Sequence, residues 1–240
     1  MKARKATIKR KTSETDIQIE FVVDGKGVSR VDTQLPFLDH MLTLLAKHGL
    51  FDLKLKARGD LEVDIHHTNE DIGIALGQAL VKALGNKKGI RRYGSFAVPM
   101  DEALVRVTLD ISGRPSLYVT KAKGVRLSRQ PKYTLDDAVD FLRAFCQHAG
   151  INMHIGVLAG EDTHHIIEGM FKGIAKTLDM ATSLDPRVHG IPSTKDASAL
   201  VDSLNSRFAA AIPSGTPFYR VWWWDSAGLK RHPEPLPWRP

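Results

Sequence analysis

Cysteine and long apolar runs are the features that this sequence most clearly lacks. Cys146 is the only cysteine among 240 residues, which excludes an internal disulfide and fits a reducing compartment. No apolar stretch approaches the roughly 20 residues of a membrane-spanning helix. The basic segment 1–15 lacks the apolar core of a secretory signal. We therefore expect a cytoplasmic protein without a membrane partner.

Nucleic-acid-binding motifs are also absent, although the formal net charge is +7. The basic residues are spread along the chain, which argues against nucleic acid as a partner. The net charge favours an anionic ligand. A small phosphorylated molecule fits this charge at least as well as nucleic acid does. The composition, 42% apolar and 25% charged, is that of an ordinary soluble protein with one large domain or two small ones.

One five-residue pattern, His-His-x-x-Glu, occurs twice, at His66–Glu70 and at His164–Glu168. Each copy runs into a segment with apolar residues at helical spacing, and each follows an Asp two residues upstream, Asp64 or Asp162, that can cap a helix. On such a helix the first His and the Glu lie on one face, and the second His points about 100° away. We therefore expect two metal ions, each bound by a His/Glu pair from one copy and the second His of the other.

A competing capping signal is Thr68 with Asp71, and a helix that begins there would weaken this same-face argument. Imidazole and carboxylate ligands without thiolate suit Mn, Fe, Co, Ni or Zn, so the pattern does not select one metal. The His-Glu-x-x-His pattern of zinc hydrolases is absent.

The order of expected elements also repeats, which predicts two half-repeats at about 1–94 and 95–196. Each half has strands, a helix, a further strand and a second helix, and helices with one apolar stripe need a sheet to cover it. The turn Asp24–Gly27 is expected to make a hairpin into the third strand. Aligning His48 with His148 places His40 opposite Asp140. The expected strands are 3–10, 16–24, 28–31 and 51–57, then 95–99, 103–111, 116–121 and 151–157; the first helices of the halves are 36–49 and 135–148.

Residues 197–240 differ in character from the repeats, with many prolines and the run Trp222-Trp223-Trp224. We interpret them as an appended tail outside the catalytic fold, with at most one short strand at 218–224.

Several basic side chains are candidates for holding a phosphate. Arg92 and Arg114 stand in glycine-containing turns, Lys172 follows one turn after Glu168, and Ser193-Thr194-Lys195 combines hydroxyls with an ammonium group. The alternative for each is an ordinary solvated charge. Glu14, in a polar break between strands, is a candidate general acid/base, and its alternative is a simple turn residue.

Six ordered motifs then carry a resemblance to the imidazoleglycerol-phosphate dehydratase family, over residues 1 to about 196. They are Phe37-Leu38-Asp39-His40-Met41, the segment 64–71, Pro99-Met100-Asp101-Glu102-Ala103, Ser112-Gly113-Arg114-Pro115, the segment 164–172 and Pro192-Ser193-Thr194-Lys195. The resemblance implies an α/β (α+β) fold of duplicated strands–helix–strand–helix halves, with helices packed between two mostly antiparallel sheets. It also implies two Mn²⁺ per active site and a homo-oligomer of trimers, a 24-mer, with sites at subunit interfaces.

Site residues carry over by position from the family. The implied metal ligands are His40, His66, His67, Glu70, His164, His165 and Glu168, with Asp140 where the family has an eighth ligand, a His. The implied substrate-binding residues are Glu14, His40, His48, His66, Glu70, Arg92, Arg114, His164, Lys172, Ser193, Thr194 and Lys195, and the implied catalytic residues are Glu14, His48, Glu70 and Glu168. Leu44 stands where the family usually has Gln, which removes one substrate contact. His154 is expected in the core or behind a ligand.

The implied reaction converts imidazole-glycerol phosphate to imidazole-acetol phosphate and water in histidine biosynthesis. The carbon that loses a proton has no neighbouring carbonyl, so metals on both imidazole nitrogens are expected to stabilise an imidazolate, which expels the hydroxyl through a diazafulvene while Glu14 shuttles protons. Two alternatives remain: a metalloenzyme on the same scaffold with another phosphorylated substrate, and a non-catalytic particle that metals hold together.

Overall fold

The computed structural model describes residues 3–128, 132–193, 222–225 and 228–231. The chain divides into two units, Met1–Pro192 and Ser193–Pro240, each of which is described by itself.

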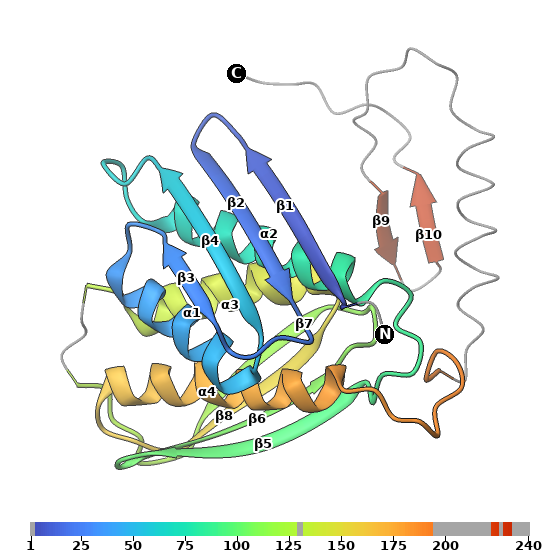
Figure 1. The fold of residues 1–240 in the computed structure, drawn as a ribbon. Coiled ribbons are helices and arrows are strands. Elements are labelled where there is room, and N and C mark those ends of the chain that lie inside the picture. Colours follow the sequence, from blue (N-terminus) through green and yellow to red (C-terminus); the bar gives the residue numbers. More distant parts are fainter. Residues whose placement is uncertain (1–2, 129–131, 194–221, 226–227, 232–240) are drawn as a thin grey trace. The chain divides into compact units, whose positions relative to one another are not determined.

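The larger unit contains the same series of elements twice, as the duplication predicts (Figure 1). The first series is β1 (Lys5–Lys11), β2 (Thr15–Val22), β3 (Ser29–Asp32), α1 (Pro36–Gly49), β4 (Asp52–Gly59) and α2 (His66–Leu84). The second is β5 (Tyr93–Met100), β6 (Ala103–Asp110), β7 (Ser116–Lys121), α3 (Leu135–Ala149), β8 (Asn152–Ala159) and α4 (Thr163–Thr182).

Each series builds a four-stranded sheet, and the strand orders correspond: β1-β2-β4-β3 and β5-β6-β8-β7. In both sheets the first two pairings are antiparallel and the edge pairing, β3 with β4 or β7 with β8, is parallel. Alternation along β2 turns Ile17, Ile19 and Phe21 inward and their polar neighbours outward. The predicted duplicated α/β (α+β) fold with mostly antiparallel sheets is confirmed.

The predicted hairpin from 16–24 into 28–31 is wrong. β2 already pairs with β1 on one edge and β4 on the other, so β3 crosses the end of β4 and pairs with its far edge, in parallel. The carboxylate of Asp52 holds this crossover, because its Oδ1 accepts the backbone N–H groups of Lys26 (2.8 Å) and Val28 (3.0 Å).

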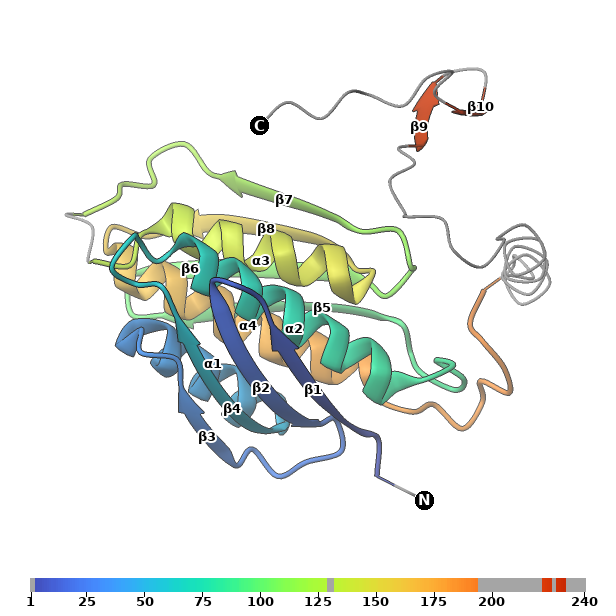
Figure 2. The ribbon, with the colours of Figure 1, turned by 90° about the horizontal axis from the view of Figure 1, so that it is seen from above.

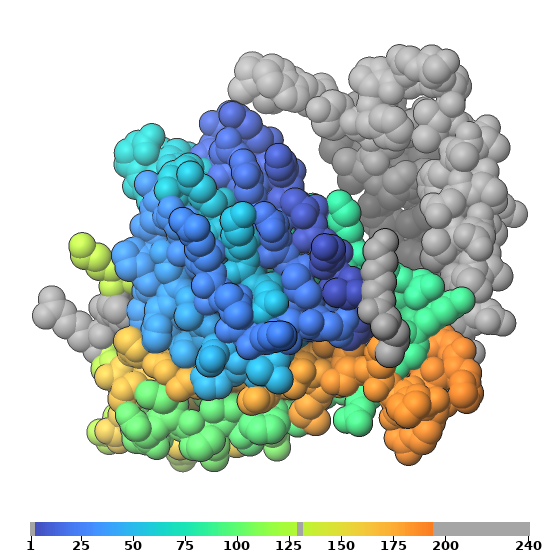
Figure 3. Space-filling view, in the orientation of Figure 1, coloured from blue at the N-terminus to red at the C-terminus, as the bar shows by residue number. Residues whose placement is uncertain are grey.

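The four helices lie between the two sheets, with α1 packed on α4 and α2 on α3 (Figures 1 and 2). In the space-filling view the blue first half and the green strands of the second half form opposite surfaces, with orange chain between them (Figure 3). Because each helix pair combines one helix from each half, side chains from both halves meet between the helices.

The contact between α2 and α3 depends on two glycines. A Cβ at Gly73 would lie 2.6 Å from the carbonyl oxygen of Phe141, and one at Gly77 would lie 2.7 Å from that of Phe145. These neighbours are backbone atoms, which cannot rotate away, so the helices reach this separation only with glycine at both positions.

Cys146 lies on α3 and is 1% exposed, and burial raises the pKa of its thiol to about 12. Because the thiolate is the reactive form, we expect no alkylation by iodoacetamide at pH 8 over an hour in the folded protein. In guanidinium chloride the same thiol should react within minutes, which mass spectrometry detects. Equal rates in both conditions would mean that α3 opens readily from the core.

In the smaller unit, β9 (Trp222–Asp225) and β10 (Gly228–Arg231) pair antiparallel. The expectation of at most one short strand in the tail is therefore wrong. Within the described residues, the helices are too short or too polar to span a membrane.

Candidate functional site

The start of α4 brings His164 and Glu168 together with His40 of α1. The side chain of Asp162 caps α4 by accepting the N–H of His164 (2.7 Å), as predicted. Nε2 of His164 lies 3.3 Å from Oε2 of Glu168, and Nε2 of His40 lies 3.9 Å from the same oxygen. One ligand atom from each residue lies within 4.8 Å of the other two. The second histidine of each pair points in a different direction from the first, as the helical geometry predicts.

The position of His40 follows from the start of α1. Pro36 stands at the first helical position, where its missing N–H costs nothing. Asp39 then accepts both the N–H (2.9 Å) and the hydroxyl (2.6 Å) of Thr33, which fixes the first turn to the end of β3. Phe37 packs edge-on against the ring of His164, with centroids 5.0 Å apart.

Glu168 is 8% exposed, and Nζ of Lys172 donates to its Oε1 at 2.7 Å. Burial opposes the negative charge, but Lys172 outweighs it, so the pKa of Glu168 lies below its ordinary value. His48, two turns after His40, has its pKa lowered by burial and then by Lys172. The face between α1 and α4 therefore holds a charged carboxylate, an ammonium group and an imidazole whose pKa is lowered.

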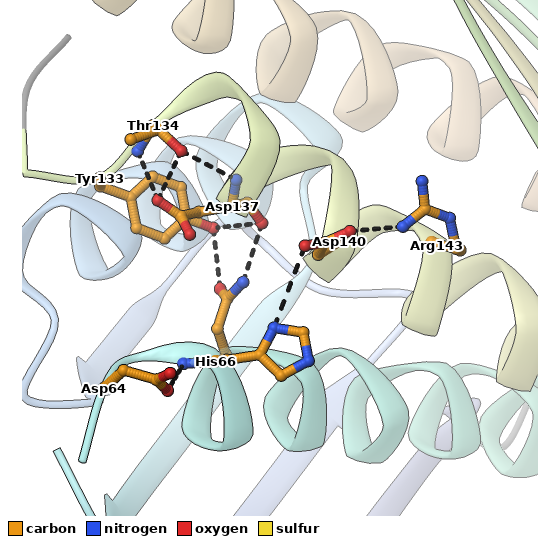
Figure 4. Close-up of polar contacts among 8 residues, drawn as sticks. Asp64, His66, Tyr133, Thr134, Asp137, Asp140 and Arg143 are labelled. Atoms are coloured by element: carbon orange, nitrogen blue, oxygen red, sulfur yellow. Dashed lines mark hydrogen bonds and ion pairs between the residues drawn. The ribbon is translucent and has the colours of Figure 1, made fainter.

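A corresponding but less complete cluster lies between α2 and α3. Nδ1 of His66 is 4.0 Å from Oδ2 of Asp140, whose other oxygen accepts a hydrogen bond from Arg143 (Figure 4). Asp64 accepts the N–H of His66 (2.7 Å), as Asp162 does in α4. The side chain of Glu70 is exposed and has no hydrogen-bond or ion-pair partner among the residues that the structure describes.

A polar network fixes the two helices that carry this cluster. Thr134 and Asp137 form a reciprocal capping box at the start of α3. The hydroxyl of Tyr133 donates to Oδ1 of Asn69 (2.9 Å), and the amide of Asn69 donates to the carbonyl of Asp137 (2.8 Å), so the first turns of α2 and α3 are joined (Figure 4).

The second histidine of each pair donates its Nδ1–H to a carboxylate. His67 bonds to Oδ2 of Asp60 at 3.0 Å, and His165 bonds to Oε2 of Glu102 at 2.8 Å. The hydrogen bond raises the pKa of each imidazole. The sequence does not predict these roles of Asp60 and Glu102. It shows only that Asp60 lies in the turn after the expected strand 51–57 and that Glu102 lies in the motif 99–103.

Glu14 lies in the turn between β1 and β2, close to His67. Its Oε2 is 4.0 Å from Nδ1 of His67, and its side chain is 48% exposed. The structure thus brings the expected acid/base residue to an expected metal ligand, although the two are far apart in sequence.

The expected phosphate-binding arginines lie elsewhere in the unit. Arg92 forms two hydrogen bonds with Asp110 and a third with the carbonyl of Pro192 (2.6 Å), and its N–H bonds to Ala181 at the end of α4. The 20 residues of α4 span about 30 Å, so Arg92 is remote from His164 of the same chain. Arg114 is exposed in the turn before β7, Ser193 is exposed, and Thr194 and Lys195 lie outside the described residues.

The structure contradicts one alternative and one expectation at the level of single residues. Thr68 does not begin a helix, because it lies inside α2 and is fully buried. His154 is not in the core: it is exposed on β8 and stacks on Tyr118 with ring centroids 4.6 Å apart. Leu44, between His40 and His48 on α1, is half-buried against the core.

The donor atoms fit a divalent metal ion. His40, His164 and Glu168 supply two imidazoles and one carboxylate, and they form the one group of three such ligands that converges in the part of the chain that the structure describes. Nitrogen and oxygen donors without thiolate suit Mn²⁺ and its first-row neighbours.

Comparison with known proteins gives a consistent result. The family model of imidazoleglycerol-phosphate dehydratase matches residues 33–178. The dehydratase of Caldanaerobacter subterraneus subsp. tengcongensis is 56% identical over 192 residues, which cover 80% of this chain and 98% of that one. That of Prochlorococcus marinus is 52% identical over 195 residues, covering 80% and 96%.

Solved structures agree with the sequence relatives. The crystal structure of the dehydratase from Staphylococcus aureus is 35% identical, with a TM-score of 0.64, covering 75% of this chain and 100% of that one. The dehydratase from Pyrococcus furiosus is also 35% identical, with a TM-score of 0.66 and coverage of 78% and 98%. The chain belongs to the imidazoleglycerol-phosphate dehydratase family.

Proposed function

We propose that this chain dehydrates imidazole-glycerol phosphate to imidazole-acetol phosphate with the help of two divalent metal ions, Mn²⁺ being the first candidate. Membership of the family makes it a hydro-lyase of histidine biosynthesis. The observation that supports a metal-dependent reaction most strongly is the convergence of His40, His164 and Glu168. We expect the enzyme in the cytoplasm.

His40, His164 and Glu168 would hold one metal, and His66, Glu70 and Asp140 the other. His67 and His165 of a second copy of the chain would complete the two sites. Bound there, the metals supply Lewis-acid stabilisation of negative charge on the substrate's imidazole ring, in place of the carbonyl that the substrate lacks. Asp140 would act as a ligand where the family has histidine, with Arg143 fixing its orientation.

The chain's own residues would bind the phosphate and move the protons. Dehydration breaks one C–H bond and the C–O bond of the neighbouring hydroxyl, and the enol that results takes a proton on carbon to become the ketone. Glu14, exposed beside His67, would accept the first proton and return one later. Lys172, Arg92, Arg114, Ser193, Thr194 and Lys195 would hold the phosphate, and neutral His48 would accept or donate a hydrogen bond beside Lys172.

Assembly into trimers and a 24-mer would complete each site. Arg92 lies at the opposite end of α4 from His164, so Arg92 and the metal ligands of one chain are too distant to hold one small substrate. A second copy would supply the missing groups, so this separation supports sites between copies of the chain.

Turnover of imidazole-glycerol phosphate by the Mn²⁺-reconstituted full chain tests the proposal, with metal counted on the same sample. We expect turnover with about two metal ions per subunit, since two ligand groups are available. A protein that binds one metal ion or fewer per subunit and shows no turnover would contradict the two-metal site and point to Asp140. An Asp140→His variant that recovers both the second metal ion and the turnover would locate the defect there.

A second variant, Glu14→Gln, tests the acid/base role, because it keeps the shape of the side chain but removes the base. It should keep its metal and lose about 10²–10⁴-fold in turnover. A panel of other phosphorylated substrates tests the same-scaffold alternative. If the chain instead forms a non-catalytic particle, chelation of the metal would change the size of the assembly, and no turnover would be measured before or after chelation.

A further inference from the structure

The internal duplication places Glu14 and Glu102 at equivalent positions. Ile19 pairs with Ile8 in the first hairpin, and Val107 pairs with Phe96 in the second, at matching positions of the two sheets. Glu14 stands five residues before Ile19, and Glu102 stands five residues before Val107. Each glutamate therefore occupies the turn just before the second strand of its half, facing the second histidine of that half's pair.

The two glutamates nevertheless differ in what they bond. Glu102 accepts the Nδ1–H of His165 at 2.8 Å, and its other oxygen accepts the backbone N–H groups of Glu161 and Asp162. Glu14 stops 4.0 Å from Nδ1 of His67, beyond hydrogen-bond distance. Both side chains are exposed, but Glu102 bonds through both of its carboxylate oxygens, whereas the nearest contact of Glu14 is too long for a hydrogen bond.

Asp60 accounts for this difference. Asp16 pairs with Arg58, whereas its equivalent Leu104 pairs with Ala159 after a register shift of one residue in β8, so Asp60 corresponds to Glu161. Asp60 bonds to Nδ1 of His67 at 3.0 Å, whereas the side chain of Glu161 is exposed and its backbone N–H donates to Glu102. Among the described residues, Glu102 is the one carboxylate at Nδ1 of His165.

Among the described residues, His67 is the one side chain that bonds to the carboxylate of Asp60. Its Oδ1 is buried without a hydrogen bond in the described part of the chain. An unsatisfied buried oxygen is unfavourable, so the hydrogen bond to His67 is the evident reason for a carboxylate at this position.

We propose that Asp60 is a positioning residue that holds Nδ1 of His67 and thereby leaves Glu14 free for proton transfer, the task that its equivalent Glu102 has lost to His165. The inference rests on the proposed function for the role of Glu14. A carboxylate on Nδ1–H fixes the tautomer whose Nε2 carries a lone pair for a metal. One Nδ1–H serves one such acceptor, so whichever carboxylate holds it is unavailable as a base.

The test is Asp60→Gly in the full chain, which removes the carboxylate that bonds to Nδ1 of His67 and leaves Glu14 beside it. Glu14 needs to move by about 1 Å to reach hydrogen-bond distance from Nδ1. We expect Mn²⁺ affinity close to that of the wild type, measured by calorimetry on metal-free protein, because Glu14 then orients His67. Turnover should fall about 10²–10⁴-fold, because Glu14 is no longer a free base.

Two further variants separate this role from a structural one. Asp60→Gly/Glu14→Gln should lower Mn²⁺ affinity by about 10–100-fold, since the remaining acceptor for Nδ1–H is then neutral and weak, although Glu14→Gln alone should not. Asp60→Asn keeps an oxygen that accepts Nδ1–H, so it should recover at least about tenfold of the turnover that Asp60→Gly loses. Asp60→Ala, which adds no backbone freedom, is run beside Asp60→Gly in case glycine impairs folding.

Turnover at the wild-type rate in Asp60→Gly and Asp60→Ala would overturn the proposal. An Mn²⁺ affinity in these single variants that is as low as in the double variant would also overturn it. If the wild type itself does not turn over imidazole-glycerol phosphate, the proposed function fails. The Mn²⁺ measurements then still decide whether Asp60 and Glu14 are alternative partners of His67.

Discussion

The Glu168→Gln variant is expected to retain about one metal ion per subunit instead of two and to lose at least about 10³-fold in turnover, a barrier increase of about 4 kcal/mol. Glu168 is the residue shared by both close contacts of the His40/His164 cluster, and it is nearly buried. A neutral amide of the same shape removes the charge that a divalent ion needs and leaves the ammonium group of Lys172, 19% exposed, without its partner.

The measurement is metal content by elemental analysis, together with steady-state turnover over a range of Mn²⁺ concentrations. Glu20→Gln is the matched control, because it makes the same chemical change in an exposed surface pair with Lys54. Such pairs contribute about 0–1 kcal/mol, so the control should behave as the wild type does. Two metals per subunit in Glu168→Gln would contradict the role of Glu168 as a ligand.

Gly77→Val is expected to lower the free energy of unfolding by about 3 kcal/mol, because the new side chain meets backbone atoms of α3 that cannot move independently. The neighbours are the carbonyl of Phe145 at 2.7 Å and the N–H nitrogen of Ala149 at 2.9 Å from the position of the Cβ. For a unit of this size, that change corresponds to a decrease of about 6–12 °C in Tm. Where the variant folds, α3 should be displaced from α2.

Thermal unfolding followed by circular dichroism measures the effect. Gly190→Val serves as the control, since a Cβ at Gly190 meets no atom within 4 Å. An unchanged Tm in Gly77→Val would show that α2 and α3 separate without loss of stability. The loss of metal from the His66/Asp140 cluster in a folded variant would show that the helix spacing sets that site.

The elements that could be predicted from the sequence are those specified by residues close to each other in the chain. The helices that start at the His pairs follow from apolar periodicity and from Asp64 and Asp162, each two residues from the N–H that it binds. The duplication follows from repetition of the same local signals. The contact of His164 with Glu168 is one helical turn and could be predicted for that reason.

The features that were missed depend on contacts between distant segments. Nothing near β3 indicates that Asp52 will direct the chain across β4. The link between Glu102 and His165 joins residues 63 positions apart, and the exposure of His154 depends on which face of β8 the helices cover. Arg92 is predicted as a phosphate ligand from its turn and from the resemblance, whereas its bonds to Asp110 and Pro192 depend on the completed fold.

The pairing of α1 with α4 and of α2 with α3 has a consequence for the origin of the site. His40 of the first half faces Glu168 of the second, and Asp140 of the second half faces His66 of the first. This reciprocal exchange is that of an isologous dimer, in which one surface patch contacts its own copy. One polypeptide thus holds the arrangement of a two-fold dimer. Because its two halves are not identical chains, a side chain in one cluster can differ from its counterpart in the other: Asp140 stands where the first half has His40, and Ile74 stands where the second half has Lys172.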